Sequence, residues 1–221
     1  MLSLLPLAVA ASVPGAPRAP SPLLADAFAA WESFRDPLNG LFCDTLSLPT
    51  SPDADTAAVV PCGPQNNRYS SAGTGMGLVA EAAFAEAGLL GRAEAQTRAL
   101  QTITTLATRW PKEPFHGMYI HWPTRELSGG GGGFSTVDTA EMALGALFAG
   151  NFYGGPVHTA AQALAKNISW SAAIKAADDP TIFPLVNGSD GTLSGSIRPF
   201  NEYYLVAYLA QLLEPESDKA Q

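Results

Sequence analysis

Apolar residues recur at intervals of three and four along most of the chain, which is typical of amphipathic helices. This pattern predicts six helices, over residues 22–35, 74–88, 91–109, 136–151, 156–177 and 199–213. Pro199 favours a helix start there, because proline suits the first helical position. Strand patterns are weak, although residues 117–122 could pair briefly. We therefore predict an all-α domain over residues 21–213, followed by a polar tail over residues 214–221.

The predicted helices are joined by connections of alternating length. Residues 36–73, 110–135 and 178–198 form long connections, whereas helices two and three, and helices four and five, are separated by only a few residues. Long loops inside a compact domain are usually functional. In an up-and-down array of antiparallel helices, alternate connections lie at the same end. We therefore expect all three long loops to gather on one rim.

The fourth helix begins after a run of five glycines and carries two acids, Asp138 and Glu141, among almost wholly apolar neighbours. Ser135 and Asp138 fit a capping box, so a purely structural role for Asp138 is an open alternative. Glu141 lies too far inside the helix to cap it. Two acids on a helix that otherwise looks buried are candidates for chemistry.

The sixth helix carries Glu202 close to its predicted start, ahead of Leu205, Val206 and Leu209. We expect Glu202 to head the stripe that faces the core. An acid near a helix N-terminus is favourable electrostatically, which is the structural alternative. A carboxylate that points inward is costly unless it is paired or hydrated, so Glu202 is a candidate general acid.

The long loops are rich in aromatic and polar side chains. Aromatic rings suit sugars, because a sugar presents both an apolar C–H face and hydroxyl groups. Trp110 and Phe115 are expected to pack loops onto helices. For Tyr119, His121 and Trp122, packing and sugar contact are comparable alternatives.

Composition excludes several classes of function. The net charge of −8 and the absence of a basic cluster argue against nucleic acid or an anionic membrane as partner. The sequence lacks a G-x-S-x-G nucleophile elbow, a P-loop lysine and a tight histidine cluster, so we expect neither a metal nor a cofactor. Three carboxylates with aromatic residues on one rim are compatible with glycoside cleavage.

The ends of the chain and its cysteines bear on localisation. Residues 1–20 contain a short apolar run and small residues, which resembles a secretory signal peptide; a disordered leader is the alternative. If the protein is exported, Cys43 and Cys62 could form a disulfide, and two free thiols are the other possibility. We expect a secreted or extracytoplasmic protein.

Four segments resemble the glycoamylase-like domain family, in the order and spacing of that family. They are residues 70–103, the loop FHGMYIHW at 115–122, the segment FSTVDTAEMALGALFAGNFYGG at 134–155, and RPFNEYYLVAYLAQL at 198–212. The resemblance implies an (α/α)6 toroid with a carbohydrate cleft at one rim. Characterised members of the family include endo-β-1,2-glucanases, which act with inversion.

The resemblance also implies roles for individual residues. Asp138, Glu141 and Glu202 fall on acidic positions of the family's cleft. The residues that fall on substrate-binding positions are Tyr119, His121, Trp122, Phe200 and Asn201. The implied substrate is an oligo- or polysaccharide, with β-1,2-glucan as the favoured guess.

The chain holds only six of the twelve helices that such a toroid needs. A non-catalytic carbohydrate-binding protein and an incomplete gene product therefore stay open beside the hydrolase. A half toroid also leaves apolar helix flanks uncovered, with Tyr204, Tyr208 and Leu212 as candidates for an open edge. Since exposed apolar patches mark interfaces or aggregation hazards, we expect self-association.

Overall fold

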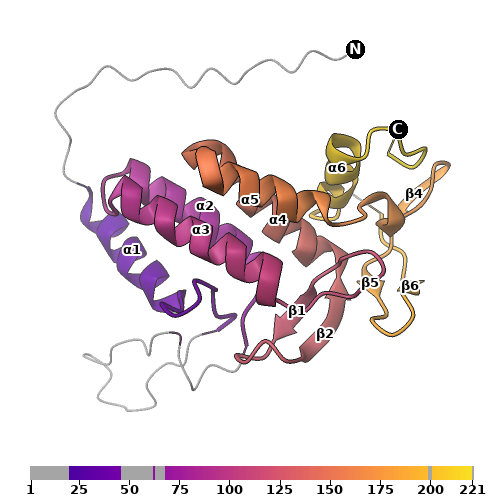
Figure 1. Cartoon of the computed structure of the whole chain (residues 1–221), viewed down its shortest axis with the longest axis horizontal. Coiled ribbons are helices and arrows are strands. Elements are labelled where there is room, and N and C mark those ends of the chain that lie inside the picture. Colours follow the sequence, from indigo (N-terminus) through magenta and orange to yellow (C-terminus); the bar gives the residue numbers. More distant parts are fainter. Residues whose placement is uncertain (1–19, 46–61, 63–67, 199–200, 221) are drawn as a thin grey trace.

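The computed structural model describes residues 20–45, 62, 68–198 and 201–220. In these parts, six α-helices form most of the molecule (Figure 1). They are α1 (Pro22–Phe34), α2 (Ser71–Glu86), α3 (Arg92–Arg109), α4 (Thr136–Tyr153), α5 (Gly155–Lys166) and α6 (Tyr204–Leu213). The predicted helix number is therefore confirmed for the described residues. None of these helices combines the length and the apolar character needed to cross a membrane.

The prediction of a purely helical fold is wrong, because the long connections contain strands. A four-stranded antiparallel sheet has the order β1-β2-β5-β6, and β3 pairs separately with β4. The strands are β1 (Ile120–Pro123), β2 (Gly130–Ser135), β3 (Ile174–Ala176), β4 (Asp179–Ile182), β5 (Leu185–Val186) and β6 (Leu193–Ser194). Glycine-rich β2 lacks the alternation of apolar and polar residues by which strands are recognised, so the pattern did not predict it.

The described parts of the three long connections meet at one end of the helices. β1 and β2 come from the second long connection, and β2 pairs with β5 from the third. The first long connection joins them, because Arg68 bridges to Thr124 and the Tyr69 amide donates to the Pro123 carbonyl at 3.3 Å. The predicted gathering of long loops on one rim is confirmed for these residues. Figure 1 shows the sheet beside the ends of the helices.

Helix α4 is apolar nearly all round because helices cover it on several sides. It packs against α2, α5 and α6. The contact with α2 is a backbone-to-backbone approach: a Cβ added at Gly145 would lie 2.1 Å from the Gly75 carbonyl oxygen, and one added at Gly75 would lie 2.4 Å from the Glu141 carbonyl oxygen. Glycine at both positions therefore sets the spacing of these two helices.

The fifth predicted helix is shorter than expected, because the chain turns after Lys166. The Trp170 indole is fully buried and donates to the Ala165 carbonyl, and the Glu214 carboxylate accepts from the Trp170 and Ser171 amides. A short 3₁₀ helix (Ser171–Ala173) and β3 follow. Glu214 thereby also fixes the start of the polar tail, in which the Lys219 ammonium donates to the Ile174 carbonyl.

Cys43 and Cys62 form a disulfide, with their Cα atoms 5.7 Å apart. The bridge closes a loop with a sequence separation of 19 and lies in the main hydrophobic core. Replacing both cysteines by serine should lower the free energy of unfolding by about 3 kcal/mol, mostly because the unfolded chain gains freedom. Urea unfolding of the variant and of the oxidised parent measures this difference. Equal stabilities would show that the bridge does not constrain the chain.

Candidate active site

The junction between β2 and α4 places Asp138 at the centre of a hydrogen-bonded group. Ser135 is the N-cap of α4, since its hydroxyl accepts from the Asp138 amide at 3.3 Å. The same hydroxyl donates to one oxygen of the Asp138 carboxylate. In the predicted capping box that carboxylate would return to the cap's backbone amide, but the Ser135 amide donates to the Tyr119 carbonyl instead. The carboxylate is thus free for another partner.

That partner is His121 on β1, whose Nε2 lies 2.9 Å from Asp138 Oδ1. The imidazole stacks on Trp122, with ring centroids 3.8 Å apart, and the Trp122 indole donates to Asp44 Oδ1 at 3.0 Å. Asp44 directly follows the disulfide-bonded Cys43. Three segments that are distant in sequence therefore fix the position of one histidine.

Two of the five consecutive glycines, Gly130 and Gly132, are explained by this histidine and its neighbour Trp122. Gly132 has a φ of 79°, and a Cβ there would lie 2.9 Å from the Trp122 ring and 3.1 Å from His121 Cβ. A Cβ at Gly130 would lie 2.1 Å from the Trp122 carbonyl oxygen. Strand β2 can pass this close to β1 only because these residues lack side chains.

A pocket of about 510 Å³ opens beside this group, and we call it the acidic pocket. Its lining residues are His121, Ser135, Val137, Asp138, Glu141, Pro184, Leu185, Glu202 and Tyr203. The structure thus brings together the three acids that the sequence singled out, from α4 and from the segment before α6. Leu185 of β5 and Pro184, which precedes it, also line the pocket.

The two acids on α4 have opposite electrostatic environments. Burial raises the pKa of Asp138, but the hydrogen bonds from His121 and Ser135 outweigh burial and hold it below its usual value. Burial raises the pKa of Glu141, and the negative charges of Asp138 and Glu202 raise it further. Carboxyl groups whose environments separate their pKa values are suited to different roles, one ionised and one protonated.

Glu202 lies at the pocket but not as predicted. It is exposed and precedes α6, which begins only at Tyr204, so the expectation that Glu202 heads the core-facing stripe is wrong. The Asn201 side chain accepts from the Tyr203 amide at 3.2 Å, which forms a turn at this point. Asparagine side chains commonly stabilise such turns and compete with helix formation. Glu202 therefore contributes its charge from the mouth of the pocket.

The other residues implied by the resemblance lie in different surroundings. Tyr119 is 1% exposed and belongs to the core, and burial raises its pKa to about 12. Trp122 lines a neighbouring hollow with Arg68 rather than the acidic pocket. Asn201 is exposed and is not among the pocket's lining residues. Phe200 lies outside the described residues.

Tyr203 is a member of the pocket that the sequence pattern did not reveal. Burial raises the pKa of its phenol, and the charges of Asp138 and Glu202 add to this effect. Its position next to Glu202 could have indicated that Tyr203 lines the pocket. A helix that began at residue 199 would place Tyr203 on a different face from Glu202, whereas α6 begins only at Tyr204. In the described ranges, no three side chains of histidine, cysteine, aspartate or glutamate converge as metal ligands.

Solved structures with a similar fold include β-1,2-glucanases. The chain superposes on a β-1,2-glucanase from Parabacteroides distasonis with a TM-score of 0.66 and 18% identity, over 86% of this chain and 27% of that one. It also superposes on an endo-β-1,2-glucanase from Chitinophaga pinensis, in complex with sophorotriose and glucose, with a TM-score of 0.58 and 19% identity, over 84% of this chain and 46% of that one. The chain shares the fold of part of these enzymes.

A third structure extends the comparison. A protein from Bacteroides uniformis that is assigned as a glucoamylase matches with a TM-score of 0.66 and 18% identity, over 85% of this chain and 44% of that one. The chain therefore spans less than half the length of each of these three proteins. No protein-family model matches the sequence, and no curated protein matches it. The resemblance to glucanases and glucoamylases predicted from the sequence is confirmed at the level of fold.

Proposed function

We propose that this chain carries the acidic pocket of a glycoside hydrolase that acts on a glucan, with β-1,2-glucan as the favoured substrate. The observation that carries the proposal is the pair of neighbouring carboxyl groups on α4 with opposite pKa shifts, in a pocket with a histidine and a tyrosine. The fold shared with β-1,2-glucanases supports the choice of substrate class. Inversion at the anomeric carbon is proposed from the resemblance alone.

The pocket suggests a role for each acid. Glu141, whose raised pKa favours the protonated form, would give its proton to the glycosidic oxygen as the C–O bond breaks. This is the role that the sequence pattern gave to Glu202. Asp138 remains ionised and, with His121, would orient the attacking water or a sugar hydroxyl. Glu202 would act through its charge, which helps to keep Glu141 protonated.

We also propose that the protein works outside the cytoplasm. The disulfide between Cys43 and Cys62 supports this, because such bonds persist in oxidising compartments. The segment that resembles a signal peptide lies outside the described residues.

The proposal is tested by incubating the purified chain with β-1,2-glucan, β-1,3-glucan and starch while the release of reducing ends is measured. We expect release from β-1,2-glucan only, and proton NMR of the first product should show the inverted anomer. Release from starch alone would contradict the choice of substrate. Absence of both release and binding for every glycan would contradict the proposed function.

One observation favours a second candidate, a carbohydrate-binding protein without turnover. The chain superposes on only 27% of one β-1,2-glucanase and 46% of the other, so the likeness extends to only part of each enzyme. Calorimetric titration with β-1,2-linked oligosaccharides distinguishes the two. Binding without any release of reducing ends would support this second candidate.

A further inference from the structure

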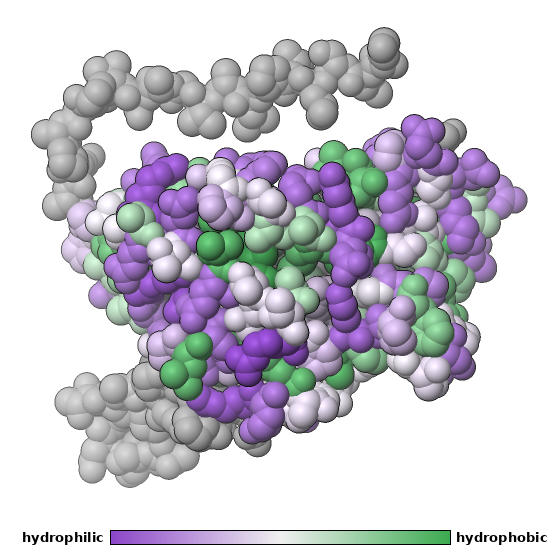
Figure 2. Space-filling model, in the orientation of Figure 1, coloured by the Kyte–Doolittle hydropathy of each residue, from purple (hydrophilic) through white to green (hydrophobic). Residues whose placement is uncertain are grey.

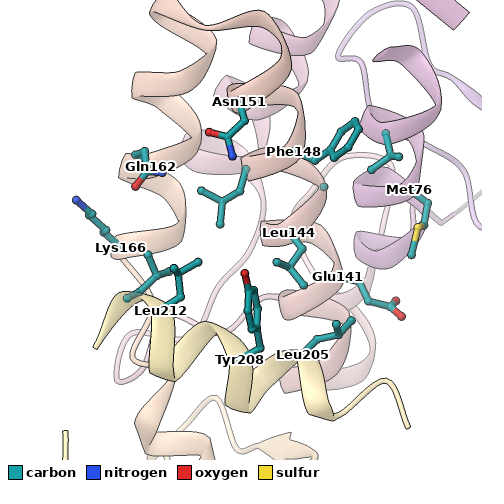
Figure 3. A pocket seen from close by; sticks show the side chains of 14 residues that line it. Met76, Glu141, Leu144, Phe148, Asn151, Gln162, Lys166, Leu205, Tyr208 and Leu212 are labelled. Atoms are coloured by element: carbon teal, nitrogen blue, oxygen red, sulfur yellow. The ribbon is translucent and has the colours of Figure 1, made fainter. Parts of the chain in front are cut away.

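A large apolar groove lies next to the acidic pocket, between α2, α4, α5 and α6. Its volume is about 730 Å³, and Figure 3 shows its lining side chains. Most are apolar, and Leu144, Leu205 and Tyr208 project into it. The face of the molecule in Figure 2 has only small apolar areas among polar ones.

The groove is bordered by large apolar side chains that stand in solvent. Met76 is 56% exposed, Phe148 48%, Leu212 44% and Tyr208 42%, and all four line the groove. Exposed apolar groups gathered in one place usually mark an interface. The same face therefore has both protruding side chains and a hollow that can receive them. In a two-fold dimer the same surface of each copy contacts the other, so that surface must be complementary to itself.

A lysine and a glutamate flank the groove. Lys166 at the end of α5 lies on one side, and Glu141 on α4 lies on the other, next to α2 (Figure 3). Among the described residues, neither forms an ion pair. A two-fold axis running along the groove exchanges its two sides. It would bring Lys166 of each copy opposite Glu141 of the other.

We propose that this groove is the docking surface for a second copy of the chain, packed face to face about such an axis. Phe148 and Tyr208 of each copy fill part of the hollow of the other, and two Lys166–Glu141 pairs fix the register. Burial of the apolar side chains supplies the driving force, while the charge pairs select the two-fold arrangement. In the dimer, the Lys166 ammonium of the other copy favours the ionised form of Glu141. That form has no proton to give, so dimerisation competes with use of the acidic pocket.

The first test uses two tyrosines of the same helix. Tyr208 lines the groove, whereas Tyr204 is 58% exposed and does not. Sedimentation velocity of the full chain across the micromolar range should show a reversible dimer. Tyr208→Ser should shift it to monomer, while the matched control Tyr204→Ser should leave the distribution unchanged. A parent chain that sediments as a monomer throughout, or equal effects of the two changes, would overturn the proposal.

The second test exchanges the two charges. Lys166→Glu and Glu141→Lys should each weaken the dimer by about tenfold or more, because each places like charges opposite one another twice. The double variant should regain most of the parent's dissociation constant. Arg109→Glu, an exposed change on α3 away from the groove, is the control. If the double variant dimerises no more tightly than the weaker single variant, the paired register is rejected. Circular dichroism melts verify that all variants are folded.

Discussion

Replacing Glu141 by glutamine should lower the rate of glucan hydrolysis by about 10²–10⁴, the usual loss when a general acid is removed. Glutamine keeps the size of the side chain but has no proton to give. Burial and the charges of Asp138 and Glu202 raise the pKa of Glu141, which favours the protonated form that a general acid needs. Hydrolysis is measured as reducing ends released per mole of folded chain.

Glu202→Gln distinguishes this assignment from the one that the sequence pattern suggested. Glu202 is exposed at the mouth of the pocket, so its removal should cost much less than removal of Glu141. It should also move the basic limb of the pH–rate profile to lower pH, because one negative charge that raises the pKa of Glu141 is lost. Glu86→Gln, at an exposed position on α2, controls for the loss of a surface charge. A larger loss for Glu202→Gln than for Glu141→Gln would return the acid role to Glu202.

The helices and the rim were predictable because they depend on local signals. Apolar residues at intervals of three and four located all six helices, and the start of α4 at residue 136 agrees with the predicted one. Ser135 was recognisable as an N-cap because it is followed by Asp138 in the right position. The alternation of loop lengths then placed the acids of α4 and the segment before α6 at the same end.

The features that the sequence did not predict depend on contacts between distant segments. Strand β2 exists because its glycines let it pass over Trp122, and the glycines themselves carry no alternating pattern. Helix α6 starts only at Tyr204 because Asn201 forms a turn. Glu202 is therefore exposed instead of facing the core as predicted. The separation of the pKa values of Asp138 and Glu141 requires His121, which comes from another strand. Helical periodicity contains none of this information.

Glu81 on α2 is an acid whose importance only the structure reveals. It is 1% exposed, and its Oε1 lies 3.8 Å from Nε of Arg35. Within the part of the chain that the structure describes, neither of these two atoms has a hydrogen-bond partner. Burial raises the pKa of Glu81 to about 8, although the positive charges of Arg35 and Arg98 oppose this. The buried carboxyl group therefore holds its proton at neutral pH.

This pKa makes stability depend on pH in a defined direction. In the unfolded chain Glu81 ionises near the ordinary glutamate pKa of 4.5, whereas in the folded chain its pKa is about 8. Between these values the unfolded state releases a proton that the folded state keeps, so a rise in pH favours unfolding. The contribution is complete below pH 4.5 and is lost progressively up to pH 8. One pKa unit corresponds to about 1.4 kcal/mol, so the shift of Glu81 is worth on the order of 5 kcal/mol in total.

Glu81→Gln should remove this dependence, because an amide of the same shape cannot ionise. We expect the variant to be more stable than the parent by on the order of 4 kcal/mol at pH 8, and by less than about 1 kcal/mol at pH 5. Urea unfolding at several pH values measures both, and the difference between variant and parent cancels the titration of other groups. Glu86→Gln, exposed on the same helix, should leave the parent's slope unchanged. A variant less stable than the parent at pH 8 would mean that Glu81 is ionised in the fold and held by Arg35.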